Sequence, residues 1–306
     1  MTNLIIPNSV TNIGDFAFAN CTALTSLTIP DSVTGIGMET FEFCNGLTNL
    51  VISTNLTSVG SYAFYYCTRL DCVNIPDSVT NIEYGAFEGC TNLASITLPN
   101  DITFIPDYLF DSCSSLANIT LPNGINSIGA EAFLNCISLT NITIPNSVVN
   151  IGYLAFSGCA SLTKITIPNS VTSIGEEAFS GCANLNSIYF SGNVPITGVD
   201  AFIYDPVTIY YLPGTTGWNM VFDLRPTAPW LPQMQTADGG FGLQTNHFGF
   251  NLSWASGQTV VVDACTNLSN PVWAPVQTNT LITGSAYFSD SQWTNYPGRF
   301  YRLHSQ

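Results

Sequence analysis

Charged side chains are scarce in this sequence. They make up 8% of its 306 residues, against about a quarter in an ordinary soluble domain. Lysine and arginine together number 5, against 20 aspartates and glutamates, which gives a formal net charge of −15. Binding to nucleic acid, or to an anionic membrane surface, depends on many lysine and arginine side chains. We therefore expect neither kind of partner.

Long apolar runs and catalytic motifs are also missing. No apolar run approaches the ~18 residues that a membrane span needs, so we expect no membrane insertion. The first residues, Met1 to Pro7, contain neither a basic region nor a long apolar stretch, and no signal peptide is visible. There is no G-x-S-x-G, P-loop or G-x-G-x-x-G motif, and His247 and His304 lie near no nucleophile motif. We predict no catalytic, cofactor-binding or metal-binding residues, and hence no enzyme.

A 23-residue repeat dominates what is present. Phenylalanine recurs every 23 residues from Phe18 to Phe202, cysteine from Cys21 to Cys182, and leucine from Leu24 to Leu185. The consensus of the unit is L-T-x-I-T-I-P-x-S-V-T-x-I-G-x-x-A-F-x-x-C. Self-similarity at a fixed period is typical of solenoids, in which stacked units bury an apolar face that one unit cannot bury alone.

The second unit shows how each repeat is expected to fold. Leu27 and Ile29 alternate with small polar residues, which predicts a half-buried strand, and Pro30 ends it because proline cannot donate to a ladder. Gly37 permits a tight corner. Acidic residues follow, and then Phe and Cys three residues apart, a pattern that favours a short helix. The prediction is a parallel β ladder with short convex helices.

The unit resembles a known repeat type. Its I-P-x-S-V, I-G-x-x-A-F and C columns are similar to the BspA-like leucine-rich repeat of bacterial surface proteins, over residues 1–204 and about nine units. The resemblance implies a leucine-rich-repeat solenoid. It also implies an extracellular or cell-surface, non-enzymatic protein that binds or adheres to a protein or glycan.

The ten cysteines are expected to be mostly unbridged. Equivalent side chains of stacked coils point the same way, whereas a disulfide requires Cβ atoms that face each other at about 3.8 Å. Cysteine is also a small apolar side chain that buries readily. We predict a column of buried free thiols. Cys72 and Cys265 lie outside the column, and a bridge between them is the alternative that stays open.

In a solenoid of this class, the outward strand positions form the usual binding surface. Nearly all of them here are Thr, Asn or Ser. One interpretation is that β-branched threonine simply packs well on a parallel sheet. The other is a flat neutral surface that binds a glycan or a protein. The candidate residues of this concave face are Ser95, Thr97, Asn118, Thr120, Asn141, Thr143, Lys164, Thr166 and Tyr189.

The repeat decays after Phe202. Residues 205–230 are predicted to form a cap and linker, because the last coil would otherwise expose strand edge and core. Short alternating runs in residues 231–306 predict a small all-β sandwich domain of Ig-like or fibronectin-like kind. The segments V-V-V-D-A-C-T-N-L (260–268) and G-R-F-Y-R-L (298–303) resemble a C-terminal module of secreted verrucomicrobial proteins.

The aromatic and basic residues of this last part have their own expected roles. All five tryptophans follow the repeats, and they either fill the cap and the small core or form a stacking platform for sugar rings. Arg299 and Arg302 are predicted to pair with Asp263 or Asp290.

The first coil suggests an alternative function. Leu4 and Ile6 match Leu27 and Ile29 of the next unit, so the sequence begins inside a repeat. We expect either an upstream segment or a covered first coil. An open parallel coil is a template for another chain. Self-association into head-to-tail filaments, as a structural protein, is therefore the alternative.

Overall fold

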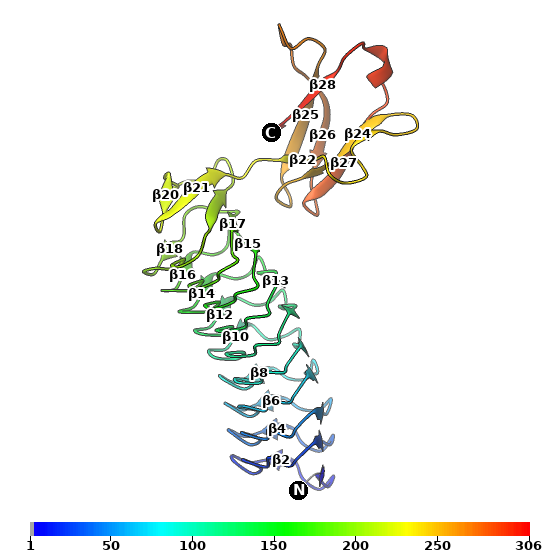
Figure 1. The fold of residues 1–306 in the computed structure, drawn as a ribbon. Helices are drawn as coiled ribbons and strands as arrows, with labels where there is room; N and C mark the ends of the chain where they lie inside the picture. The colour runs from blue at the N-terminus through cyan, green and yellow to red at the C-terminus, as the bar shows by residue number, and fades with distance from the viewer. Residues whose placement is uncertain (1–2) are drawn as a thin grey trace. The chain divides into compact units, whose positions relative to one another are not determined.

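The computed structural model describes residues 3–306, and the chain forms two compact units (Figure 1). Unit 1 comprises Met1–Ala228 and unit 2 comprises Pro229–Gln306. Unit 1 is a stack of coils that begins at the end marked N in Figure 1. Each coil contains one odd-numbered strand, a turn, one even-numbered strand and a second group of turns. We call this second group the turn segment.

The odd-numbered strands follow one another every 23 residues over most of the stack. Side chains point alternately outward and into the core, as the exposed–buried–exposed pattern of β5, β7 and β9 shows. We call the outward side chains of these strands the strand face. The strands are β1 (Asn3–Ile5), β3 (Ser26–Thr28), β5 (Asn49–Val51), β7 (Cys72–Asn74), β9 (Ser95–Thr97), β11 (Asn118–Ile119), β13 (Asn141–Ile142), β15 (Lys164–Ile167), β17 (Ser187–Phe190) and β19 (Thr208–Tyr211).

The even-numbered strands form a second parallel ladder. They pair in two groups, β2 to β8 and β10 to β18. The strands are β2 (Asn12–Ile13), β4 (Gly35–Ile36), β6 (Ser58–Val59), β8 (Asn81–Ile82), β10 (Phe104–Ile105), β12 (Ser127–Ile128), β14 (Asn150–Ile151), β16 (Ser173–Ile174) and β18 (Ile196–Thr197).

The coils are in register. Leu4 of β1 pairs with Leu27 of β3, which pairs with Leu50 of β5. Ile128, Ile151 and Ile174 align in the same way on the even-numbered strands. Like residues therefore stack on like residues, and the predicted parallel ladder and solenoid are confirmed.

The predicted convex helices are wrong. Each turn segment is a run of tight turns in which every fourth residue is left-handed, such as Glu39 (φ 51°) and Phe43 (φ 52°), so an α-helix cannot form there. The N–H groups of Glu39, Phe41 and Phe43 donate at 2.8 Å to carbonyls of the next coil instead. The spacing of Phe and Cys that favoured a helical turn is satisfied equally well by consecutive turns. Among the described residues the only helix is the 3-10 helix η1 (Trp293–Asn295).

The acidic residues at the start of the turn segments also act differently from the prediction. Asp15 and Asp107 accept from backbone N–H groups of the next coil, and Glu83 accepts from Ser61 of the preceding coil, so these carboxylates join coils rather than cap a helix. Asp15 accepts from the N–H of Met38 at 2.8 Å, and Asp107 accepts from the N–H of Ala130 at 2.7 Å.

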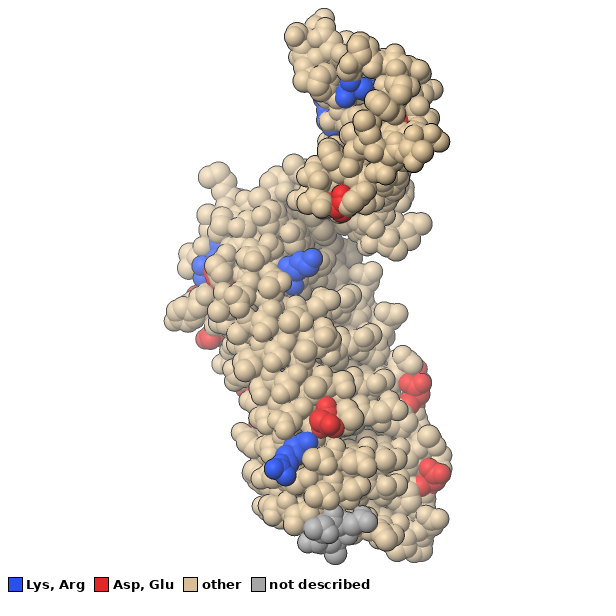
Figure 2. All heavy atoms as spheres, turned by 45° about the vertical axis from the view of Figure 1, so that its right-hand side comes forward, with Lys and Arg blue, Asp and Glu red and all other residues tan. Residues whose placement is uncertain are grey.

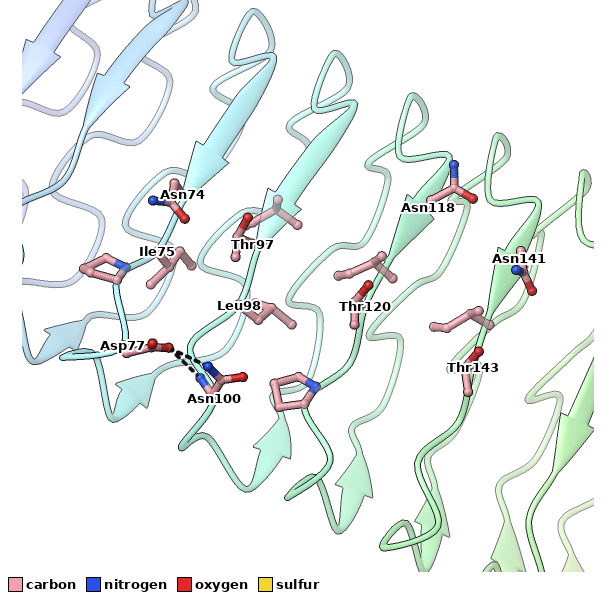
Figure 3. A pocket seen from close by; sticks show the side chains of 15 residues that line it. Asn74, Ile75, Asp77, Thr97, Leu98, Asn100, Asn118, Thr120, Asn141 and Thr143 are labelled. Carbon is pink, nitrogen blue, oxygen red and sulfur yellow. Dashed lines mark hydrogen bonds between the residues drawn. The ribbon is translucent and has the colours of Figure 1, made fainter. Parts of the chain in front are cut away.

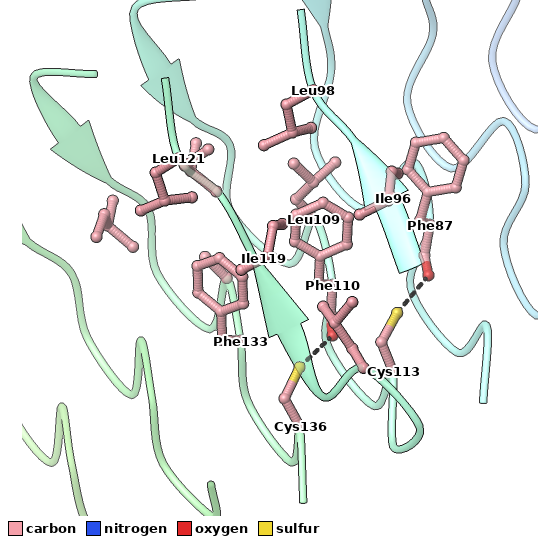
Figure 4. Packing of buried hydrophobic residues seen from close by; sticks show 14 of the residues in the cluster. Phe87, Ile96, Leu98, Leu109, Phe110, Cys113, Ile119, Leu121, Phe133 and Cys136 are labelled. Atoms are coloured by element: carbon pink, nitrogen blue, oxygen red, sulfur yellow. Dashed lines mark hydrogen bonds between the residues drawn. The ribbon is translucent and has the colours of Figure 1, made fainter. Parts of the chain in front are cut away.

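A column of phenylalanine rings runs through the core of unit 1 (Figure 4). Neighbouring rings from Phe18 to Phe202 are stacked, with centroids 5.2–6.3 Å apart. The rings from Phe41 onward are fully buried. The widest gap, 6.3 Å, lies between Phe87 and Phe110.

The cysteine column is buried from Cys44 to Cys182, as predicted, while Cys21 at its start is half-buried, and all of its thiols are free. Each thiol from Cys44 to Cys182 donates to the carbonyl oxygen of the phenylalanine 26 residues earlier. Cys113 reaches the oxygen of Phe87 at 3.2 Å, and Cys136 reaches that of Phe110 at 3.2 Å (Figure 4). Each of these carbonyls also accepts from the backbone N–H of the cysteine three residues later, such as Phe87 from Cys90 at 3.2 Å, so the thiol supplies a second hydrogen bond that joins one coil to the next.

The last coils of unit 1 extend the odd-numbered sheet with β21 (Arg225–Pro229) and β20 (Val221–Phe222), in the order β15-β17-β19-β21-β20. Trp218 packs at this end, with its ring centroid 4.9 Å from Phe190 and 5.3 Å from Phe222. This tryptophan fills the end of the core, in line with the first interpretation of the tryptophans.

Unit 2 is all-β and contains two antiparallel sheets. One pairs β24 (Phe248–Ser253) with β22 (Gln233–Gln235), β23 (Gly242–Leu243) and β27 (Ser285–Asp290). The other has β25 (Thr259–Cys265) between β26 (Ala274–Thr280) and β28 (Phe300–Ser305).

Aromatic side chains connect these two sheets. The Tyr301 ring of β28 lies 5.3 Å from Phe288 and 5.9 Å from Phe250 of the other sheet. An Ig-like or fibronectin-like sandwich stays a prediction.

Two ion pairs stabilise unit 2, and both were predicted from the sequence. Arg299 lies 3.0 Å from Asp290, and Arg302 lies 2.8 Å from Asp263. The carboxylates of both pairs are buried, with 7% and 5% of the side chain exposed.

Candidate binding face

The predicted site residues all lie on the odd-numbered strands or directly after them. Eight of the nine are exposed, and Tyr189 is half-buried. They share one face because strand side chains alternate, so that the buried residue between each outward pair packs into the core. The exposed eight are Ser95, Thr97, Asn118, Thr120, Asn141, Thr143, Lys164 and Thr166.

The strand face is nearly free of charge. Figure 2 turns the right-hand side of Figure 1 forward, and charged side chains on unit 1 are few and scattered in this view. Lys164 is the only candidate residue that carries a charge. A surface of hydroxyl and amide groups offers hydrogen-bond donors and acceptors in equal measure. It suits a neutral polar ligand better than an anion or a cation.

A shallow pocket of about 600 Å³ lies on this face between β7 and β13 (Figure 3). Five of the nine candidates line it, namely Thr97, Asn118, Thr120, Asn141 and Thr143. The isoleucines between them form its apolar floor, and Ile96 and Ile119 are each 8% exposed. The structure therefore brings the central candidates together.

The other four candidates, Ser95, Lys164, Thr166 and Tyr189, do not line this pocket.

Sequence reasoning missed part of the pocket wall. Asn74, an outward strand position outside the nine candidates, lines it from β7, and Asp77 and Asn100 line it from the turns that follow β7 and β9. The Asp77 carboxylate accepts from the backbone N–H of Asn100 at 3.0 Å and from its side-chain amide at 3.1 Å (Figure 3). The 23-residue step from 77 to 100 carried the signal, because it places these two residues in adjacent coils.

An aromatic pair lies on the strand face of the last coils. Tyr189 of β17 and Tyr210 of β19 are stacked, with ring centroids 5.0 Å apart. Tyr210 escaped the sequence analysis because β17 and β19 are paired with a step of 21 residues rather than 23. A step of 23 residues from Tyr189 leads to Leu212, two residues after Tyr210.

Cys72 is exposed on the strand face, and its thiol is free. Cys265 is also free and lies buried in unit 2. A hydrogen bond to Asp71 raises the pKa of the Cys72 thiol. The bridge between Cys72 and Cys265 that the sequence left open is absent.

The described part of the chain holds no cluster of three or more histidine, cysteine, aspartate or glutamate side chains arranged to bind a metal ion. Within residues 3–306, no helix is both long and apolar enough to cross a bilayer.

Comparison with known proteins identifies the family. The model of the BspA type leucine rich repeat region matches residues 1–117 and 103–216, in six copies. The chain therefore belongs to the BspA type leucine-rich repeat family. Leucine-rich repeat domains generally mediate protein interactions, and the family model that matches is not that of a catalytic family.

Solved structures agree with this assignment. A leucine-rich repeat protein from Bacteroides ovatus is 30% identical, with a TM-score of 0.56 over 66% of this chain and 59% of that one. A leucine rich cell surface protein from Faecalibacterium prausnitzii is 32% identical, with a TM-score of 0.52 over 65% of this chain and 64% of that one. The chain thus spans less than two thirds of either protein. No curated protein matches it.

Proposed function

We propose that this chain is a non-enzymatic binding protein of the bacterial surface or the extracellular space, and that its strand face holds a neutral protein or glycan. The observation that carries the proposal is the pocket between β7 and β13, where hydroxyl and amide groups stand above an isoleucine floor and Asp77, the one charged residue of the lining, is hydrogen-bonded to Asn100. Sugar rings present hydroxyl groups and apolar C–H faces, which match such a surface. The Faecalibacterium prausnitzii protein is a cell surface protein, which supports the proposed surface or extracellular location of this chain.

The parts of the chain have separate roles in this proposal. Residues 1–204 form the binding solenoid, residues 205–230 its cap and linker, and residues 231–306 a β domain of the Ig-like or fibronectin-like kind. The resemblance of this last segment to a module of secreted proteins favours an extracellular location.

Binding to a glycan array and to a set of extracellular matrix proteins tests the proposal. The full chain is compared with a variant that carries Thr120→Lys and Thr143→Lys in the pocket. Because both threonines are exposed, the lysines should leave the fold intact while they place two charges where a neutral ligand would sit. We expect loss of at least tenfold in affinity for any retained ligand, as for a charge left unpaired in an interface.

The matched control carries Asn123→Lys and Asn146→Lys. These asparagines are exposed in the same two coils but do not line the pocket. The control variant should bind like the unchanged chain. No retained ligand on either array, or equal loss in the two variants, would refute the proposal.

Self-assembly into filaments is the alternative. Sedimentation velocity over a concentration series, with negative-stain microscopy at the highest concentration, separates the two functions. Growth of long particles with concentration would favour the structural function, and a constant mass would exclude it.

A further inference from the structure

A cluster of aromatic rings lies on the turn segments of the second to fourth coils, away from the strand face. We call its five rings the tyrosine patch: Phe43, Tyr62, Tyr65, Tyr66 and Tyr84. Tyr65 is central, with its ring centroid 4.6 Å from Tyr66, 5.3 Å from Phe43 and 5.4 Å from Tyr62. Tyr66 is 38% exposed and Tyr84 is 49% exposed. Contiguous exposed aromatic surface of this kind marks interaction sites.

Glycines of the fourth coil make room for these rings. A Cβ atom on Gly85 would lie 2.2 Å from the Tyr62 ring, and one on Gly89 would lie 2.4 Å from the Tyr66 ring. Both glycines have a positive φ. The rings are thus held against bare backbone, which fixes their position.

The solenoid itself does not require aromatic residues here. The turn-segment column that contains Phe43 and Tyr66 carries small or polar residues in the next five coils, before Tyr204, and those coils stack without an aromatic ring at this position. The continuing residues are Gly89, Ser112, Asn135, Gly158 and Gly181. The patch is therefore a local departure from the repeat.

Carboxylates surround the patch. Glu42, Glu88 and Asp111 are close enough to Tyr65 for their charges to raise the pKa of its hydroxyl, although burial is the larger cause. Further along the stack, the Tyr108 hydroxyl bonds Glu131. Burial and the charges of Asp111 and Glu131 raise the pKa of Glu88 to about 7. Like charges are held together here, so a cation would relieve their repulsion.

Positive charge is scarce in this stretch of the sequence, where Arg69 is the one lysine or arginine between Glu42 and Glu131. No lysine or arginine occurs between Arg69 and Lys164. The row from Glu42 to Glu131 crosses four coil-to-coil steps of about 4.8 Å, which is roughly 20 Å and matches an extended segment of about six residues. Tyrosine faces also attract lysine and arginine side chains.

We propose that the tyrosine patch and its carboxylates form a second binding surface, which takes an extended lysine- or arginine-rich segment of a partner protein. Lysine or arginine side chains would lie over the rings of Tyr65 and Tyr66 and pair with Glu88, Asp111 and Glu131. This surface is separate from the strand face, and the proposal holds whatever ligand that face binds.

Titration calorimetry with synthetic peptides tests the proposal. The probes are a ten-residue peptide of alternating lysine and serine, its counterpart with glutamate in place of lysine, and spermine. The patch variant carries Glu88→Gln, Asp111→Asn and Glu131→Gln. The control variant carries three exposed substitutions elsewhere, Asp31→Asn, Asp101→Asn and Glu176→Gln, and has the same net charge.

The lysine peptide should bind the unchanged chain and the control variant with affinities within about twofold, whereas the patch variant should lose about tenfold, since each surface pair contributes modestly. Tyr66→Leu, which keeps every carboxylate, should lose severalfold. Equal loss in the patch and control variants would overturn the proposal, because net charge alone would then explain binding. Equal binding of the glutamate peptide, or spermine as tight a ligand as the lysine peptide, would overturn it as well.

Discussion

Asp205 should make the stability of the solenoid fall as the pH rises, and Asp205→Asn should abolish this dependence. Asp205 stands 23 residues after Cys182, at the position that the cysteine column occupies in earlier coils. It is 2% exposed, and neither carboxylate oxygen has a hydrogen-bond partner. Burial raises its pKa to about 8.

The sign follows from the proton balance. Between its ordinary pKa of 3.8 and about 8, the folded chain keeps a proton on Asp205 that the unfolded chain has released. The contribution of Asp205 to the free energy of unfolding is therefore fully present below the lower pKa, and it is lost as the pH rises through this window. Each pH unit is worth about 1.4 kcal/mol, so the loss reaches about 4 kcal/mol at pH 7.

Urea unfolding of the full chain, followed by circular dichroism at pH 5.5, 6.5 and 7.5, measures the effect above the sequence pI of about 4.1. Over these two pH units the unchanged chain should lose about 3 kcal/mol more than the Asp205→Asn variant. Asp101→Asn removes an exposed carboxylate and should leave the pH profile unchanged. Parallel profiles for the unchanged chain and Asp205→Asn would refute the reasoning.

Two further predictions concern the cysteines and the glycines of unit 1. In the folded chain, Ellman's reagent should titrate the exposed Cys72 and, more slowly, the half-buried Cys21, while the eight buried thiols react only in denaturant; rapid reaction of more than two thiols would contradict the buried column. Gly89→Ala should destabilise the chain by at least about 1 kcal/mol more than Gly181→Ala. Both glycines have a φ of 72°, but only Gly89 faces a ring, that of Tyr66, at 2.4 Å; equal midpoints in thermal unfolding would contradict the tight seat of that ring.

The solenoid could be predicted because one physical constraint is repeated in every coil. A phenylalanine that packs between the rings of its neighbouring coils also packs at the same position of the next coil. The recurrence of phenylalanine from Phe18 to Phe202 in the sequence therefore predicts the stacked core directly. Free cysteines followed from the same reasoning, since parallel columns do not bring Cβ atoms face to face. The hydrogen bond from each thiol to a phenylalanine carbonyl was beyond reach, because it depends on the backbone path through the turns.

The turn segments were misread because side-chain spacing alone does not distinguish a helix from consecutive turns. Glu39 and Tyr62 adopt a left-handed conformation without being glycine. One signal was present: Gly85 occupies the same column in the fourth coil, and Gly89 the next left-handed column. Glycines at a position that must be left-handed argue against a helix there.

Departures from the repeat carry the specific chemistry of this chain. A consensus residue stabilises the packing of adjacent coils. A residue of another kind at the same position does not improve that packing. Asp205 in the cysteine column leaves a buried carboxyl group without a partner, and Tyr66, in a column whose next five residues are small or polar, needs Gly89 to make room for it. In a stack where each coil contacts only its neighbours, such a change stays local and leaves the other coils intact. The strand-face pocket and the tyrosine patch with its carboxylates share the fourth to sixth coils, but the pocket lies on the odd-numbered strands and the patch on the turn segments. In the two proposals they are therefore separate surfaces, and each can be tested by substitutions that leave the side chains of the other in place.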